Sequence, residues 1–167
     1  HVFPGLIDPH LHFGFAEPLT EYSTETAYAA QGGVTTVLAY FLKNEAYSES
    51  FAEFRAEAEA RAFVDFGFHF STARDVHAEE IDTYVNDFGV VSFKYFMNFK
   101  GEEGRYLGLD GTDDGFFLDL LQRCAQHEGV VVVAHPENIE IVSRIRRQFQ
   151  EAGRDTFRDF CESKPTF

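Results

Sequence analysis

The sequence predicts an α/β fold, a partial (β/α)8 barrel of the TIM type with about five βα units. Strand-like and helix-like stretches alternate along the chain with little between them, which is typical of βαβ units around a parallel sheet. No internal repeat beyond this rhythm and no linker interrupts it, so residues 1–167 are interpreted as a single domain. Because the chain opens on His1 without a methionine, we expect an excerpt of a longer polypeptide.

Five strands are expected, and each is justified by a short apolar or alternating run between helical stretches. A pair of glycines, Gly32 and Gly33, ends the first helix and leads into the second strand,. The expected strands are residues 2–8, 34–40, 64–70, 90–97 and 130–134. The expected helices are residues 24–31, 48–62, 77–86, 113–127, 136–151 and 155–162.

The composition excludes several classes of partner. The formal net charge of −14 argues against nucleic acid and against anionic membranes, which both favour basic surfaces. The two cysteines, Cys124 and Cys161, have no metal-type spacing and form no disulfide framework,. We expect a reducing, cytoplasmic location and no membrane span.

The first chemical signal is a pair of histidines at the end of the first strand. His10 and His12 are one residue apart, and alternate residues of a strand point the same way. Both imidazoles can therefore reach one metal ion. The alternative is two polar histidines without a ligand. The carboxyl ends of strands are where α/β folds place their chemistry, which favours the metal.

The second signal is a lysine inside an apolar strand. Lys94 is flanked by Phe93 and Tyr95, and burial favours the neutral, nucleophilic amine. A neutral amine can capture carbon dioxide, and the resulting carbamate can bridge two cations. The alternative is a lysine that extends to solvent at the strand end. His135 follows the fifth strand directly. Residues of metal-binding types therefore lie at or near the ends of three strands, and a metal centre becomes the better interpretation.

Four sequence motifs resemble those of a known family. Residues 3–13, 32–37, 92–97 and 135–138 are similar, in order and rough spacing, to the dihydropyrimidinase and hydantoinase branch of the amidohydrolase superfamily. The likeness covers nearly the whole chain and only the front portion of such a barrel. It implies a homo-oligomeric enzyme that hydrolyses the C–N bond of a small cyclic amide or imide. The resemblance also implies two divalent metal ions as cofactors, with zinc as the expected metal.

The resemblance assigns a role to each candidate ligand. His10 and His12 would bind the more buried metal, Lys94 would be the carboxylated bridge formed with carbon dioxide, and His135 would bind the second metal. The general acid/base aspartate and a further histidine ligand are expected beyond Phe167, so this chain contains no catalytic residue of its own and would not turn over substrate alone. A hydroxide held between the metals would attack the ring carbonyl.

Two departures from the family pattern concern the substrate. Phe99 falls where hydantoinases carry a tyrosine that donates a hydrogen bond to the oxyanion, and a phenyl ring cannot donate it. The arginine that dihydroorotases place after the histidine pair is missing, because Phe13 follows His12 directly. We therefore expect an unusual cyclic amide, with Phe13 and Phe99 lining an apolar pocket.

Several other polar residues have alternative interpretations. Asp8 is either an outer partner that orients an imidazole or a cap of the strand end. Glu137 and Asn138 are expected to cap a helix, His69 to be a hydrogen-bonded interior residue, and His77 to be a solvated helix position. A second class of function also stays open, in which the chain is a catalytically silent fragment or homologue that serves binding or assembly.

Overall fold

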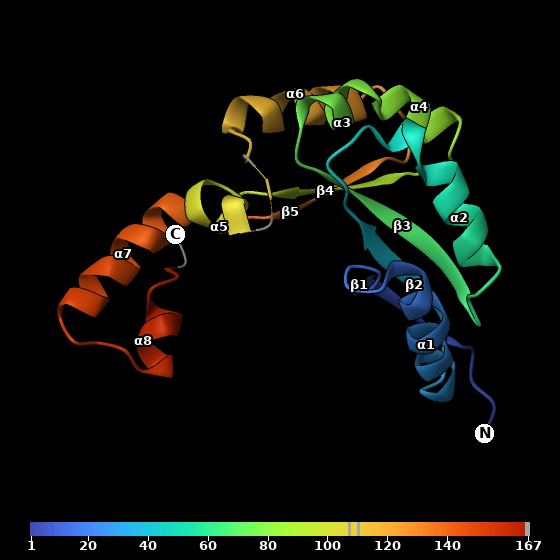
Figure 1. Cartoon of the computed structure of the whole chain (residues 1–167), viewed down its shortest axis with the longest axis horizontal. Helices are drawn as coiled ribbons and strands as arrows, with labels where there is room; N and C mark the ends of the chain where they lie inside the picture. The colour runs from blue at the N-terminus through green and yellow to red at the C-terminus, as the bar shows by residue number, and fades with distance from the viewer. Residues whose placement is uncertain (107, 110, 166–167) are drawn as a thin grey trace.

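The five expected strands form one parallel sheet. A computed structural model describes residues 1–106, 108–109 and 111–165. The strands are hydrogen-bonded in chain order, β1-β2-β3-β4-β5, and every neighbouring pair is parallel. The sheet curls, and helices lie along its outer side (Figure 1). The prediction of a partial barrel built from five βα units is confirmed.

The strands and helices have the following bounds. The strands are β1 (Leu6–Leu11), β2 (Val34–Phe41), β3 (Asp65–Thr72), β4 (Ser92–Phe96) and β5 (Val131–His135). The helices are α1 (Pro18–Gln31), η1 (Tyr47–Glu49), α2 (Phe51–Glu59), α3 (Asp75–Glu79), α4 (Ile81–Asn86), α5 (Gly101–Tyr106), α6 (Asp114–Cys124), α7 (Ile139–Glu151) and α8 (Phe157–Glu162).

The first strand differs most from its prediction. It begins at Leu6 rather than at residue 2, and Leu6 and Ile7 are 61% and 65% exposed rather than buried. β1 is an edge strand that pairs with β2 alone, so no further strand covers it within the described part of the chain. Helix α5 was not expected, and the helix expected over residues 77–86 is divided into α3 and α4.

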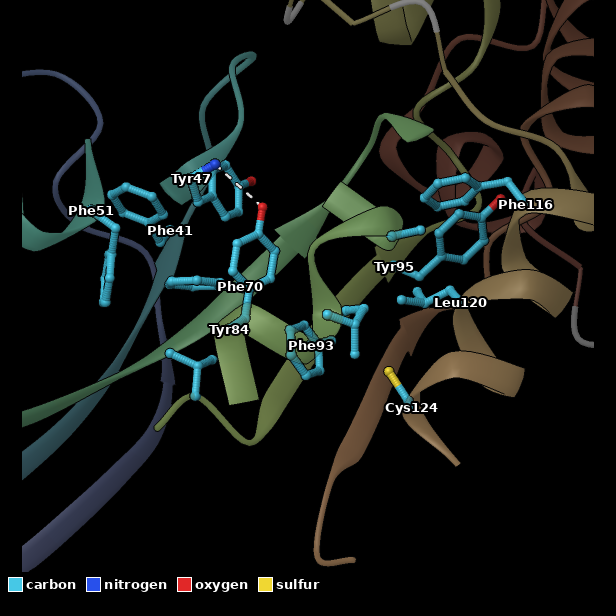
Figure 2. Close-up of a cluster of buried hydrophobic side chains, with 13 residues drawn as sticks. Phe41, Tyr47, Phe51, Phe70, Tyr84, Phe93, Tyr95, Phe116, Leu120 and Cys124 are labelled. Atoms are coloured by element: carbon cyan, nitrogen blue, oxygen red, sulfur yellow. Dashed lines mark hydrogen bonds between the residues drawn. The ribbon is translucent and has the colours of Figure 1, made fainter. Parts of the chain in front are cut away.

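An aromatic layer joins the sheet to its outer helices. Phe70 of β3 is fully buried and meets Phe51 of α2 and Tyr84 of α4 edge to face, at centroid distances of 4.7 and 5.0 Å, a favoured geometry for aromatic pairs. The Tyr84 hydroxyl accepts a hydrogen bond from the backbone nitrogen of Tyr47 (Figure 2). These buried rings lie on the outer side of the sheet. Because successive residues of a strand face opposite sides, the residues between them point to the inner side.

His77 belongs to the same layer, and its expected solvent exposure is wrong. Its ring is fully buried and stacks on Tyr47 at 4.3 Å. Nδ1 accepts the backbone N–H of Ala73 and Nε2 donates to the carbonyl of Glu45, so the neutral ring satisfies both nitrogens. Burial lowers the pKa of His77, because desolvation disfavours the imidazolium.

The last two helices of the chain lie beside the β5 edge of the sheet. Helices α7 and α8 form a pair that projects beyond β5 and α5 (Figure 1). Within the described ranges, every helix is too short or too polar to cross a lipid bilayer.

The aromatic layer generates a stability prediction. Replacing Phe70 by alanine removes a fully buried ring and should cost about 3–5 kcal/mol of unfolding free energy. The matched control is Phe157→Ala, since Phe157 is 81% exposed and its loss should change the stability by less than about 0.5 kcal/mol. Urea unfolding followed by circular dichroism measures both, and equal effects would contradict the assignment of Phe70 to the core.

Candidate metal centre

An irregularity in β1 presents the two histidines. Asp8 pairs with Val37 and Leu11 pairs with Ala39, so three steps along β1 oppose two along β2. Such bulges re-aim side chains and recur beside active sites. The rings of His10 and His12 lie 5.3 Å apart, centroid to centroid. The structure therefore brings this predicted pair together at the carboxyl end of β1.

Tyr40 is a neighbour that the sequence reasoning missed. Its hydroxyl oxygen lies 3.1 Å from Nδ1 of His10, and its ring stacks on His12 at 4.4 Å and on His69 at 4.7 Å. Burial raises the pKa of Tyr40, so the phenol stays protonated. With Nδ1 of His10 engaged, Nε2 is left as the metal-binding atom. The only sequence signal for this placement of Tyr40 was the alternation of side-chain directions along β2.

Lys94 is buried in β4. It is 3% exposed, and no described residue offers its ammonium a carboxylate or a hydrogen-bond acceptor. The Nζ atom lies 5.4 Å from the ring centre of Tyr40 and 5.0 Å from that of Phe96. Burial lowers the pKa of Lys94. This placement differs from that of a lysine extended into solvent.

His135 is the last residue of β5 and is paired in register with Phe96 of β4. Its Nε2 lies 2.9 Å from Oε2 of Glu137, and Oε1 of Glu137 lies 2.8 Å from Nζ of Lys164. Lys164 is the largest cause of the lowered pKa of Glu137, with His135 contributing. Glu137 is thus an ion-pair partner and not the expected helix cap.

The expected cap of α7 is confirmed for Asn138 alone. Its side-chain oxygen accepts the backbone N–H groups of Glu140 and Ile141, which would otherwise lack partners at the start of the helix.

The side chains of Asp8 and His69 form hydrogen bonds with backbone groups around the site. Oδ1 of Asp8 accepts the backbone N–H of His10 at 3.1 Å, which corresponds to the strand-end alternative rather than to a contact with an imidazole. His69 is 7% exposed, and its two nitrogens engage the carbonyl of Pro9 and the hydroxyl of Ser92. It is the hydrogen-bonded interior residue that the sequence predicts, with no nitrogen left for a metal.

The two phenylalanines of the expected pocket are placed differently. Phe13 is 7% exposed and packs edge to face on Tyr22 of α1 at 4.7 Å, in a core cluster with Val37 and Ala39. It therefore belongs to the helix side of the sheet. Phe99 stacks on Phe96 at 4.1 Å, beside the ring that faces Lys94, and so lies near the candidate ligands.

The donor set fits a metal only if Lys94 takes part. Among the described residues, no three His, Cys, Asp or Glu side chains gather as a metal site by themselves. The imidazoles of His10 and His12 are adjacent, and Lys94 and His135 follow on β4 and β5. An oxygen ligand is missing between them, and a carbamate on Lys94 would supply it as an anion.

The electrostatics of the pair favour neutral imidazoles. Desolvation is the largest cause of the lowered pKa of His10 and of His12, and the positive charge of Lys94 lowers both further. Neutral imidazole is the form that binds a metal. The two histidines are therefore ready to act as ligands near neutral pH.

Comparison with known proteins shows which proteins the chain resembles in sequence and fold. No family model matches the chain. D-hydantoinase of Geobacillus stearothermophilus is 31% identical over 161 residues, which are 92% of this chain and 32% of that protein. D-hydantoinase of Streptomyces coelicolor is 35% identical over 83% of the chain and 29% of its own length. An allantoinase of Deinococcus radiodurans is 29% identical over 99% of the chain and 36% of its own length.

Solved structures give the same result. A dihydropyrimidinase from Brevibacillus agri superposes with a TM-score of 0.75 and 28% identity over 97% of this chain and 35% of that one. The fold and the sequence matches thus correspond to the front part of a hydantoinase-like or dihydropyrimidinase-like barrel. The resemblance to the hydantoinase and dihydropyrimidinase branch is confirmed, and the chain spans about a third of the length of these relatives.

The proximity of Lys94 to the histidines generates a titration prediction. In metal-free buffer without carbon dioxide, Lys94→Met removes a positive charge, so the pKa of His10 and His12 should rise. Both values should stay below the usual pKa of histidine, because desolvation persists. NMR titration of the ring protons measures this, with Lys43→Met as the control. Unchanged values would contradict a positively charged Lys94 beside the pair, and a decrease would mean that Lys94 carries negative charge.

Proposed function

We propose that the complete protein is a metal-dependent hydrolase of a small cyclic amide or imide. The observation that carries the proposal is the buried Lys94, which has no counter-charge among the described residues and shares the sheet with strand ends that carry His10, His12 and His135. Relatives named D-hydantoinase and allantoinase and a structure named dihydropyrimidinase support this reaction class. In this proposal residues 1–167 form one domain, the front portion of the barrel.

Carbon dioxide completes the ligand set at Lys94. The lone pair of the neutral Nζ attacks the carbon of carbon dioxide, an N–C bond forms, and nitrogen loses one proton to solvent. The product is an anionic carbamate with two oxygens. The low pKa that burial causes at Lys94 raises the fraction of amine able to react. The carbamate would replace a buried cation by an anion, which divalent cations bound at this site would neutralise.

Each imidazole has a distinct part in this site. His10 and His12 would hold one ion, with His10 oriented by the Tyr40 hydroxyl at 3.1 Å, and His135 would hold the second. When bound, two divalent ions, zinc in this proposal, would supply Lewis acidity to the ring carbonyl and to water. The general acid/base is proposed to come from residues after Phe167.

The substrate side of the site is apolar near β4. Phe99 and Phe96 stack at 4.1 Å, and neither ring can donate a hydrogen bond to an oxyanion. The metals would then stabilise the oxyanion without a tyrosine hydroxyl, and an unusual cyclic amide is the proposed substrate. A cytoplasmic homo-oligomer is the proposed form of the complete protein.

A catalytically silent role in binding or assembly is the second candidate. It is favoured by β1, which pairs on one side only within the described part of the chain and exposes Leu6 and Ile7 there, provided that no later part of the protein covers this edge. Unpaired, apolar strand edges promote association with other chains.

Lys94→Ala in the complete protein tests the enzymatic proposal. We expect loss of at least one metal ion per chain, because the bridging anion is gone, and partial recovery on addition of a short-chain carboxylic acid. Elemental analysis after gel filtration measures metal content, and Lys43→Ala, which removes a partly exposed lysine paired with Glu45 at 3.6 Å, is the matched control. Full metal content in Lys94→Ala would refute the bridging role.

A further inference from the structure

His135 has a fixed partner outside the ligand set. Its side chain is 41% exposed, so packing alone does not hold the ring in one orientation. Its Nε2 lies 2.9 Å from Oε2 of Glu137, two residues further along the chain. This carboxylate is the only hydrogen-bond partner of the ring among the described residues.

The contact decides which ring nitrogen of a neutral His135 carries the proton. A carboxylate oxygen only accepts hydrogen bonds. If Nδ1 held the proton, an unprotonated Nε2 would face another acceptor at 2.9 Å, which is repulsive. The neutral ring therefore carries its proton on Nε2, and the lone pair of Nδ1 is left for a ligand.

Glu137 is in turn held by a lysine that follows helix α8. Nζ of Lys164 lies 2.8 Å from Oε1 of Glu137 and 4.5 Å from the ring centre of Phe160. One carboxylate oxygen thus engages the lysine and the other engages the imidazole. Lys164 is 29 residues after His135 in the sequence, so the link depends on the α7 and α8 pair packing back toward β5.

We propose that Glu137 and Lys164 are positioning residues that fix His135 with Nδ1 toward the second metal. Hydrogen-bonded carboxylates behind histidine ligands fix the tautomer and the ring orientation in this way. By its contact with the other carboxylate oxygen, Lys164 would hold Glu137 in place behind the ring. The inference rests on the proposed function, because it assigns a metal to His135, and it gives the α7 and α8 pair a role in the site.

The first test is the tautomer of His135 in the metal-free protein, read by long-range proton–nitrogen NMR on protein labelled at histidine nitrogen. The wild type should show a protonated Nε2 and an unprotonated Nδ1. Glu137→Ala and Lys164→Met should give a mixture of tautomers, and Lys164→Arg should restore the single tautomer. An Nδ1-protonated ring in the wild type, or no change in the variants, would overturn the inference.

The second test is zinc affinity of the complete protein, measured by competition with a chelator. Glu137→Ala and Lys164→Met should weaken the weaker of two zinc sites by roughly 10- to 100-fold, and Lys164→Arg should recover most of the loss. The control is Lys43→Met, because Lys43 is similarly exposed and is also paired with a glutamate. Unchanged zinc affinity in both variants would refute the positioning role.

These two tests separate the inference from the proposed function. A wild-type protein that binds no zinc but shows the expected tautomers would refute the metal centre and leave the Glu137 contact intact. A wild-type protein that binds two zinc ions while the variants keep both affinity and tautomer would refute the positioning role alone.

Discussion

The ammonium of Lys94 lies inside the curled sheet with no carboxylate near it among the described residues, and the rest of the site is organised around this unpaired charge. An isolated buried charge is costly, so the group is driven toward its neutral form. The rings of Tyr40 and Phe96 are its nearest named surroundings, and they offset only part of the cost. In the proposed function, conversion of the amine into a metal-bridging anion would remove this cost of burial.

The outer aromatic layer is the reason Lys94 points inward. Phe93 and Tyr95, on either side of it, are fully buried against the outer helices, and alternate residues of a strand face opposite sides. The same alternation turns Tyr40 inward between Ala39 and Phe41. The packing that stabilises the fold therefore also sets the direction of the groups that carry the proposed chemistry.

Much of the fold and part of the site could be predicted from the sequence. The βα rhythm indicated five parallel strands, and His10, His12, Lys94 and His135 were found from their positions at or near strand ends. The motifs could not reveal the partners that arise from register. Tyr40 reaches His10 because β1 and β2 pair through a bulge, and Lys164 reaches Glu137 only through the fold of α7 and α8. Phe13 looked like a pocket residue because it follows His12, yet it packs on Tyr22.

Native mass spectrometry of the protein purified at its natural length tests the central claim most directly. We expect a chain longer than 167 residues that carries two metal ions and one carbon dioxide adduct, with the adduct mapped to Lys94 and absent from Lys94→Ala. An unmodified Lys94 in a protein that holds both metals would contradict the bridge. A metal-free protein would contradict the metal centre itself and favour a role in binding or assembly.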